Sequence, residues 1–393
     1  MKRIVQILVF FNVALYCSYA YLYFYNKGMT SFKPLYWLFF TIVTALCLML
    51  LLRSGRLLEL PRSIIVWLLV YLSYNIICFL YSSQSEDARQ ALIEAIKLCA
   101  LFFSLLIIFQ SKQAIRISRT ALLLVVLFSV AMNLIDFIIP TWSKIHGRAA
   151  GLYANPTIAG KVMVMAMVLS VPLVTQRLRL VYCAFVGLGV LVTFSRGPWL
   201  FWFVAVIGLA SIRYIDVGRK STSIIVTASL AGIVVYSALT GGLLGFVSDA
   251  GLDKYLTQDT YTRLGGEGAA FSDSSTESRV AAAEKAWSTF GDYPWTGAGL
   301  GYDRESRNFS HNTYLVEASE GGVIKLGIFV SLLIVLWFIT DNIGRITLIV
   351  YALSSFTSLD NLRQPALIVF LCLIAVIAKE RYWAENQYNV KRL

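Results

Sequence analysis

His311 is the residue in this chain best suited to proton transfer at neutral pH. It is one of two histidines in 393 residues, and it opens the stretch His311-Asn312-Thr313-Tyr314-Leu315 after a long polar segment. The unperturbed pKa of histidine, about 6.5, lies closest to neutrality of all side chains. In the first turn of a helix and near arginines, the imidazole would be held neutral, the form that a general base needs. A lone histidine is more often only a hydrogen-bonded polar residue, so residue type alone leaves both roles open.

Two arginines stand where a phosphate group could bind. Arg279 lies in the first turn of an amphipathic helix that we expect to begin at Ser274. A cation there opposes the helix dipole, so a bound anion is a partner to expect, and a solvated loop arginine is the alternative. Arg196 lies in a tight turn, Ser195-Arg196-Gly197, between two apolar segments. Its guanidinium could bind phosphate oxygens through two parallel hydrogen bonds, or could simply snorkel from a helix end to the surface.

The composition indicates a membrane protein. Hydrophobic residues make up 58% of the chain and charged residues 14%, against about 25% charged in soluble domains. Apolar runs of about 20 residues, each long enough to cross a hydrocarbon core of about 30 Å, recur along the whole length. They lack the period-two alternation of barrel strands, so we expect an all-α polytopic protein with about twelve transmembrane helices. The predicted spans are 4–25, 35–52, 63–81, 91–109, 121–139, 158–176, 180–194, 198–212, 222–248, 322–340, 343–357 and 364–378.

The distribution of Lys and Arg predicts the orientation in the membrane. With the N-terminus inside, the segments on that side hold most of the Lys and Arg, and the short connections on the other side hold fewer. This places both termini in the cytoplasm and a large loop, 249–310, on the opposite face, between the ninth and tenth spans. The net charge of +12 then reflects topology and not nucleic-acid binding. No internal repeat is visible, so we expect a single membrane domain over 1–393.

Under this topology, three further segments face the side of the membrane that also holds Arg279. They are 147–156, which contains Arg148, the turn 193–198, and the stretch 294–301, whose glycines allow another backbone to approach closely. The polar segment then continues through His311 into Glu317 and Glu320, on successive turns of an expected helix. Cationic groups and a candidate base are therefore expected on one face of the membrane.

In order and spacing, these segments resemble those of the O-antigen ligase and polymerase superfamily of bacterial envelope glycosyltransferases. The resemblance is carried by Gly147-Arg148 with Gly-Leu-Tyr-Ala-Asn-Pro after it, Ser195-Arg196-Gly197, Arg279 eight residues before Trp287, the proline and glycines of 294–301, and His311-Asn312-Thr313-Tyr314-Leu315 followed by Glu320 and Gly322. The motifs span 147–325, while the expected layout of spans covers the whole chain. Lys325 departs from the family pattern, in which a small residue is usual, and this puts the local helix packing in question.

The resemblance implies a reaction and roles for individual residues. The reaction is transfer of a glycan from undecaprenyl diphosphate to an acceptor hydroxyl, with inversion at the anomeric carbon, on the periplasmic face of the bacterial inner membrane. His311 is implied as the general base, and Arg196, Arg279 and Arg148 as the residues that bind the diphosphate and stabilise its developing charge.

Further residues are implied in supporting roles: Asn312, Tyr314, Glu317 and Glu320. For the two glutamates, salt bridges with Lys325 and ordinary helix packing are the alternatives to orienting His311. The family is metal-independent, and the sequence contains no Asp-x-Asp motif, so we expect no cofactor and no metal. The expected partners are the undecaprenyl-diphosphate-linked glycan donor, the lipid A–core acceptor and membrane lipids, with no nucleic acid.

The acceptor distinguishes the activities within the superfamily. A ligase uses a sugar of lipid A–core, a polymerase uses another lipid-linked repeat unit, and protein-directed transferases use Ser or Thr. Polymerases tend to have two sizeable outer loops rich in Arg, whereas this chain has one, so we predict an O-antigen ligase. The alternatives are an O-antigen polymerase and another lipid-linked oligosaccharide transferase.

A polytopic transporter or lipid flippase is the alternative outside the enzymes. It would place its functional charges near the bilayer midplane. Asp136 and Lys161 are ionisable residues inside predicted spans and so are functional candidates by default. Glu94 and Lys97 are three residues apart on one predicted span, and we expect them to neutralise each other.

Overall fold

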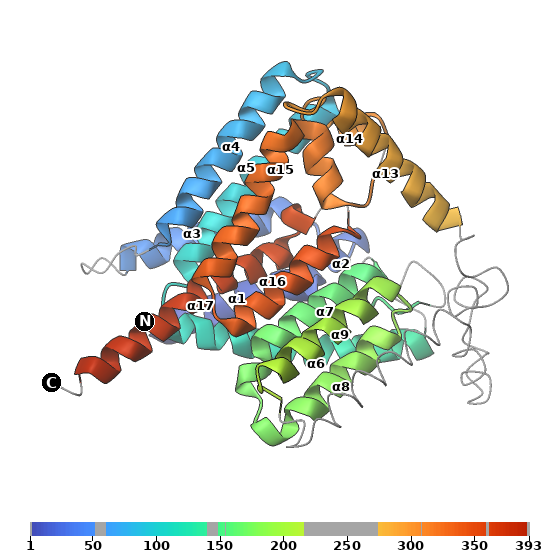
Figure 1. Cartoon of the computed structure of the whole chain (residues 1–393). Coiled ribbons are helices and arrows are strands. Elements are labelled where there is room, and N and C mark those ends of the chain that lie inside the picture. Colours follow the sequence, from blue (N-terminus) through green and yellow to red (C-terminus); the bar gives the residue numbers. More distant parts are fainter. Residues whose placement is uncertain are drawn as a thin grey trace. The chain divides into compact units, whose positions relative to one another are not determined.

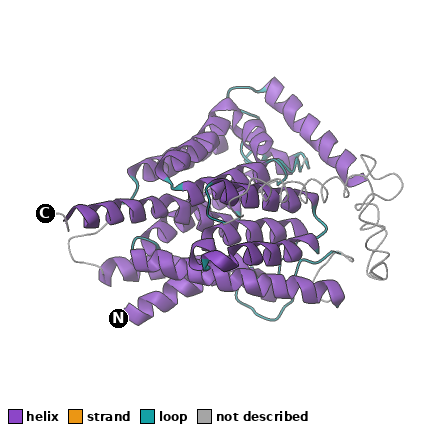
Figure 2. Cartoon of the chain, turned by 60° about the horizontal axis from the view of Figure 1, so that its bottom comes forward, coloured by secondary structure: helices purple, strands orange, loops and turns teal. Residues whose placement is uncertain are grey.

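The computed structural model describes residues 2–51, 60–139, 148–153, 155–215, 274–307, 309–358 and 361–390 (Figure 1). Within these ranges the chain forms helices and connecting loops and no strand (Figure 2). The protein is an all-α polytopic membrane protein, as its composition predicts. The predicted span 222–248 and residues 249–273 of the predicted large loop lie outside the described residues.

The helices follow the apolar runs of the sequence. Those before the stretch 216–273, which the structure does not describe, are α1 (Lys2–Ser18), α2 (Ala20–Asn26), α3 (Pro34–Leu51), α4 (Arg62–Tyr81), α5 (Glu86–Ile108), α6 (Lys112–Ile138), α7 (Pro156–Ser170), η1 (Val171–Leu173), η2 (Gln176–Leu178), α8 (Arg179–Leu191) and α9 (Arg196–Ser211). Those after it are α13 (Ser274–Asp292), α14 (Tyr302–Glu305), α15 (Thr313–Ile339), α16 (Asn342–Ser355), η4 (Asn361–Arg363) and α17 (Pro365–Val390). Each predicted span within the described ranges coincides with one of these helices or with consecutive ones.

Among the described residues, five helices are long and apolar enough to cross a membrane. They are α4, α5, α6, α7 together with η1, and α15. The predicted span 4–25 forms two helices, α1 and α2, which are bent by 56° at Tyr19 and count as a sixth candidate. The apolar parts of α3, α9 and α17 are shorter. The total of about twelve spans therefore stays a prediction.

Local sequence explains where several helices begin. The Ser85 hydroxyl accepts a hydrogen bond from the Ala88 N–H at 3.2 Å, and two acidic residues, Glu86 and Asp87, occupy the first turn of α5. The Asn155 side chain accepts from the Thr157 N–H at 2.8 Å, and Pro156 follows at the first position of α7. Polar caps, acidic first turns and an initial proline all favour helix starts, because the first N–H groups of a helix have no partner inside it.

The helices are arranged as two compact units. The first comprises Met1–Tyr16, Thr30–Ser118 and Arg279–Leu393, and the second comprises Cys17–Met29 and Arg119–Ser278. In the first unit, α5 packs against α3, α4 and α17, while α15 packs against α4 and α16. In the second unit, α7, α8 and α9 pack against one another. The single domain expected over 1–393 stays a prediction.

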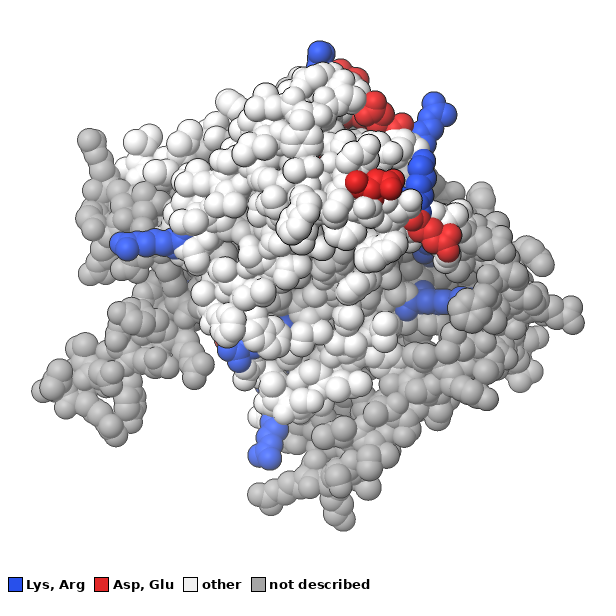
Figure 3. Space-filling view, turned by 45° about the horizontal axis from the view of Figure 1, so that its top comes forward, with Lys and Arg blue, Asp and Glu red and all other residues white. Residues whose placement is uncertain are grey.

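Apolar side chains cover much of the outer surface of the described helices. On α4, Leu69 is 61% exposed and Leu80 is 71% exposed, and on α3 Phe39 is 67% exposed. Figure 3 shows a broad face on which none of the described side chains is charged. Such a surface is unfavourable in water, but it is the normal exterior of a helix bundle in hydrocarbon.

Candidate functional site

Helix α15 is broken at two adjacent glycines. Gly321 has φ −137° and ψ 17°, and Gly322 has φ 64° and ψ −165°, neither of which continues a helix. The break separates a short helix, residues 313–320, from the apolar part that follows. The predicted span 322–340 begins at this break. The residues around His311 therefore belong to a separate short helix at the end of a membrane-crossing one.

The segment 294–301 supplies the hydrogen bonds that the break removes. The N–H groups of Ala298 and Gly299 donate to the carbonyls of Ser319 and Glu320 at 2.8 and 3.1 Å. The carbonyl of Pro294 accepts from the Val323 N–H at 2.8 Å. The ends of a helix leave such groups without partners, and leaving them buried and unpaired would be unfavourable. The backbone of the 294–301 segment thus satisfies the groups that the break exposes. We refer to the break and the segment that hydrogen-bonds to it as the joint.

Two glycines make this close approach possible. Gly297 has φ 70°, and a Cβ there would collide with the backbone of Glu320 and Gly321. A Cβ on Gly322 would collide with the carbonyl of Trp295. The sequence predicted close backbone approach for the 294–301 glycines, and the structure places the approaching backbone in α15.

Asn312 begins the short helix. Its side-chain oxygen accepts hydrogen bonds from the N–H groups of Tyr314 at 3.0 Å and Leu315 at 3.3 Å. His311 therefore stands immediately before the cap, with a φ of 49°, and not in the first turn as the sequence analysis expected. The reason is that asparagine is among the best N-cap residues, so the helix starts one residue later.

His311 is biased toward its neutral form. Its side chain is exposed at the surface but partly covered, and this partial burial, followed by the positive charge of Arg279, lowers its pKa below the usual value. Both causes disfavour the imidazolium ion. The imidazole is therefore accessible and able to accept a proton at neutral pH.

Arg279 acts electrostatically on His311 from another helix of the same unit. It lies on α13, which begins at Ser274 as the sequence predicted. That start places Arg279 in the second turn and not in the first, so the helix dipole opposes its charge less than expected. Its side chain is exposed. A cation and a base therefore interact electrostatically at the surface of the first unit.

The two glutamates of the short helix form ion pairs with Lys325. The ammonium of Lys325 lies 2.8 Å from Glu320 Oε2 and 3.3 Å from Glu317 Oε2. All three side chains are buried, with exposures of 0% for Lys325, 1% for Glu320 and 2% for Glu317. Of the alternatives left by the sequence, the salt bridges with Lys325 are therefore present. Lys325, the departure from the family pattern, is the counter-ion of both carboxylates.

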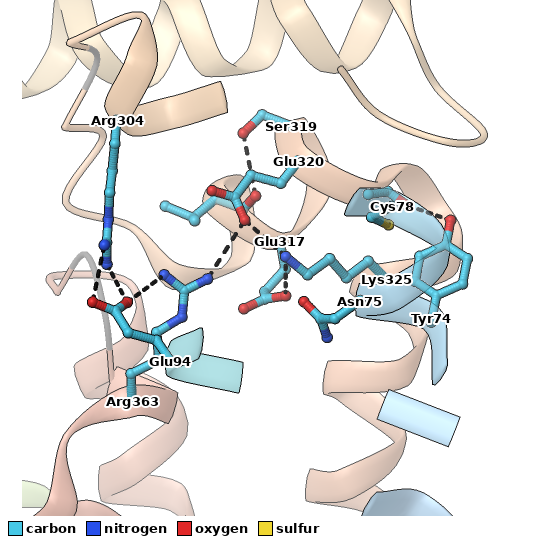
Figure 4. A network of polar contacts seen from close by, with 12 residues as sticks. Tyr74, Asn75, Cys78, Glu94, Arg304, Glu317, Ser319, Glu320, Lys325 and Arg363 are labelled. Atoms are coloured by element: carbon cyan, nitrogen blue, oxygen red, sulfur yellow. Dashed lines mark hydrogen bonds and ion pairs between the residues drawn. The ribbon is translucent and has the colours of Figure 1, made fainter. Parts of the chain in front are cut away.

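These ion pairs continue into a longer chain of alternating charges. Arg363 Nη2 lies 3.5 Å from Glu320 Oε2, and Arg363 Nη1 lies 3.3 Å from Glu94 Oε2. Arg304 donates to both oxygens of Glu94, at 3.0 and 2.5 Å. Figure 4 shows Arg363 between the two carboxylates that it contacts. The ion pairs of Glu94 thus run to Arg304 and Arg363 in place of the expected pairing with Lys97.

Sequence reasoning had placed neither Arg304 nor Arg363 near the site. The available signal was Glu94 itself, a carboxylate inside an apolar span that requires a partner.

Tyr314, which was expected as a supporting residue, packs against α16. Its hydroxyl donates to the Ala352 carbonyl at 3.1 Å, and its ring centroid lies 4.5 Å from that of Phe356. Its contacts therefore join α15 to α16.

In the second unit, the Arg148 segment and the Arg196 turn lie against each other. Arg148 Nε donates to the Thr193 carbonyl at 3.2 Å, and the Ala149 N–H donates to the Val192 carbonyl at 3.1 Å. Ser195, the N-cap residue of α9, has its hydroxyl 2.8 Å from that of Thr157. The structure thus brings together two segments that the sequence had assigned to one face of the membrane.

Asp136 and Lys161 are both buried in the second unit. Asp136 Oδ2 accepts from the N–H groups of Ala150 and Gly151, each at 3.0 Å, and so holds the backbone next to Arg148. Lys161, on α7, is 0% exposed, so protein covers it completely.

Arg196, one of the predicted phosphate-binding residues, is the first residue of α9 and is half-buried.

Comparison with known families identifies the region that contains most of these residues. Residues 181–330 match the family model described as O-antigen ligase. This match supports the O-antigen ligase superfamily, as the motifs indicated. The matched range includes Arg196, Arg279 and His311 and ends five residues after Lys325. No curated protein matches the chain.

The candidate residues are divided between the two units. His311, Arg279 and the buried charges belong to the first unit, and Arg196 and Arg148 belong to the second. Among the described residues, no group of three or more His, Cys, Asp or Glu side chains is arranged to hold a metal ion. In the first unit, the arrangement of His311 with the Arg279 guanidinium could support proton transfer.

Proposed function

We propose that the protein is an O-antigen ligase that transfers O-antigen polysaccharide from undecaprenyl diphosphate to a sugar hydroxyl of lipid A–core. The observation that carries the proposal is the exposed His311, whose pKa is lowered by partial burial and by Arg279, within the range that matches the O-antigen ligase family. This combination supplies a base at the surface and a cation suited to a phosphate group.

His311 acts as the general base in this proposal. Its neutral imidazole accepts the proton of the acceptor hydroxyl while the hydroxyl oxygen attacks the anomeric carbon of the donor sugar. The bond from that carbon to the diphosphate oxygen breaks, and the diphosphate leaves with the electron pair. Attack from the side opposite the leaving group inverts the anomeric configuration. The proton stays on His311 until solvent removes it.

The arginines bind the leaving group. Arg279 stabilises the negative charge that develops on the diphosphate, because a guanidinium stays charged at any relevant pH and can bind two phosphate oxygens. We assign Arg196 the same role, and Arg148 the role of a further contact, from the resemblance of their segments to the family. The packing of the Arg148 segment against the Arg196 turn is compatible with a shared function.

The proposed location follows from the charge distribution and from the family. The protein lies in the bacterial inner membrane with both termini in the cytoplasm, and His311 faces the periplasm, where lipid-linked glycans are available.

We assign Asn312 a supporting role. Its side chain stabilises the start of the short helix through two hydrogen bonds.

Gene deletion and complementation test the proposal. Cells that carry His311→Ala in place of the wild type should lose all O-antigen on lipid A–core and accumulate long lipid-linked glycan, as seen on gels of lipopolysaccharide and of lipid extracts. Single-repeat bands would indicate an O-antigen polymerase instead. Wild-type lipopolysaccharide from His311→Ala would exclude the catalytic base and favour a transporter or flippase.

A conservative arginine variant tests the diphosphate role. Arg279→Lys should lose most activity, because a point charge cannot replace a two-pronged hydrogen-bond donor. Arg345→Lys is the matched control, since Arg345 lies on α16 with its guanidinium 5.5 Å from the centroid of the Trp337 ring and outside the candidate site. Full activity of Arg279→Lys would contradict the assignment.

A further inference from the structure

The connection between α16 and α17 contacts the short helix 313–320 at both of its ends. At the first turn, the Thr313 hydroxyl donates to the Ser358 carbonyl at 2.7 Å and accepts from the Asn361 N–H at 3.3 Å. At the last turn, the Arg363 guanidinium lies 3.5 Å from the Glu320 carboxylate. The two contacts are seven residues apart on the helix, which corresponds to about 10 Å along its axis.

The described residues of this connection are firmly held. Asn361 is 0% exposed, and its side-chain nitrogen donates to the hydroxyls of Ser354 at 2.6 Å and Ser355 at 3.1 Å, at the end of α16. Arg363 is also held by Glu94, which belongs to α5, and Glu94 is held in turn by Arg304. The connection therefore fixes the short helix relative to α5 and α16.

Because α15 is broken, the contacts from the α16–α17 connection help to determine where the short helix lies. A continuous helix would take its direction from its membrane-crossing part, but the glycines at 321 and 322 interrupt the hydrogen bonds that would transmit it. Two points of contact separated along a helix set both its position and its tilt. The position of the short helix, and with it that of His311, therefore depends on side-chain contacts and on neighbouring segments, and not on a continuous helical backbone.

We propose that Arg363 and Thr313 are positioning residues that orient His311 by holding the two ends of the short helix 313–320. This inference rests on the proposed role of His311 as general base. Neither residue has to touch substrate. Arg363 acts through Glu320, and Thr313 acts through its hydrogen bonds to Ser358 and Asn361.

The chain of charges allows a test that separates positioning from stability. Its described ion pairs join three cations (Arg304, Arg363 and Lys325) and three carboxylates (Glu94, Glu317 and Glu320), so these six charges sum to zero. Arg363→Gln alone leaves one negative charge in excess. The double variant Arg363→Gln/Glu320→Gln is neutral again and keeps two complete pairs, Arg304–Glu94 and Lys325–Glu317. Charge balance alone predicts that the double variant behaves as the wild type, whereas the positioning role predicts a folded protein that is still defective.

The first measurement is transfer by the purified full-length protein. The double variant should melt close to the wild type and keep the KM for the lipid-linked donor within about twofold, but kcat should fall by about tenfold or more, because a misplacement of about 1 Å can cost about 100-fold. Thr313→Val, which keeps the side-chain shape and removes the hydroxyl, should show the same split between kcat and KM. Arg345→Gln is the control and should leave both constants unchanged.

The second measurement needs no transferase activity. Diethyl pyrocarbonate modifies neutral imidazole, and peptide mass spectrometry distinguishes His311 from the other histidine. The rate of modification of His311 should change in the double variant and in Thr313→Val, and it should stay at the wild-type value in Arg345→Gln. If the wild type transfers no glycan, the proposed function fails, and this rate still decides whether the connection orients His311. Wild-type kcat and wild-type His311 reactivity in both variants would overturn the inference.

Discussion

The Lys325 ammonium lies 2.8 Å from Glu320 Oε2, and the two residues stand on opposite sides of the break in α15. The ion pair joins the short helix that follows His311 to the apolar part of α15 that comes after the break. Since the backbone hydrogen bonds are interrupted at this point, the side chains and the 294–301 segment replace them.

Removing Lys325 should strongly destabilise the protein. Lys325→Met leaves Glu317 without its cation in a buried position, and breaking a buried ion pair in this way costs about 3–5 kcal/mol. The measurement is the thermal melting of the purified protein in detergent. Lys97→Met, at a partly exposed position on α5, should melt close to the wild type. Recovery of most of the loss in Lys325→Met/Glu317→Gln would confirm the cause, and a stable Lys325→Met single variant would contradict it.

The glycines of the joint should not tolerate a methyl group. Gly297→Ala and Gly322→Ala each bring a Cβ into backbone atoms that side-chain movement cannot relieve, so both variants should accumulate poorly or lose transfer. Gly327→Ala is the matched control, because a Cβ at Gly327 meets open space in the same helix. Protein yield and the lipopolysaccharide gel measure the outcome. Equal tolerance at all three positions would mean that the close approach is unimportant.

The acid side of the activity profile should depend on Arg279. The general base is active when neutral, so activity falls as the pH decreases through the lowered pKa of His311. Arg279→Gln removes a charge that disfavours the imidazolium, which raises this pKa and shifts the acid limb to higher pH. The shift should be partial, since burial is the larger cause. Transfer rates across the acid range measure it, whatever the remaining maximal rate. An acid limb at the same pH as in the wild type would show that Arg279 does not act on the base.

The cap of the short helix should contribute to stability through its side-chain oxygen. Asn312→Ala removes an acceptor for two backbone N–H groups and should cost about 1 kcal/mol. Asn312→Asp keeps the acceptor and should retain the stability, while its negative charge beside His311 raises the pKa of the imidazole. Melting temperatures of the two variants compare them directly. If Ala and Asp are equally destabilising, the cap is not the reason.

Much of the site could be anticipated where a local rule applies. The start of α13 at Ser274 was predicted from its capping pattern, and the break at Gly321 and Gly322 lies where the predicted span 322–340 begins. His311 was misplaced by the same kind of rule, since His-Asn-Thr offers more than one residue able to precede a helix. Only the backbone conformation shows that Asn312 is the cap.

The partners of the buried charges could not be anticipated in this way. Glu94 was expected to pair with a lysine on its own helix, but its partner Arg304 is 210 residues away in the sequence. Arg363 was not singled out from the sequence, yet it lies between two carboxylates. A charge inside a span demands a counter-ion, but hydropathy does not say which distant element supplies it.

The amino-acid order alone accounts for the membrane class, the helix positions and the family motifs, because hydropathy, capping and motif spacing are properties of short stretches of chain. Packing accounts for the joint between 294–301 and α15, for the counter-ions of Glu94 and Glu320, and for the contacts of Thr313 and Arg363 that hold the helix beside His311. Those features join residues far apart in sequence, and their energies exist only once the helices have come together.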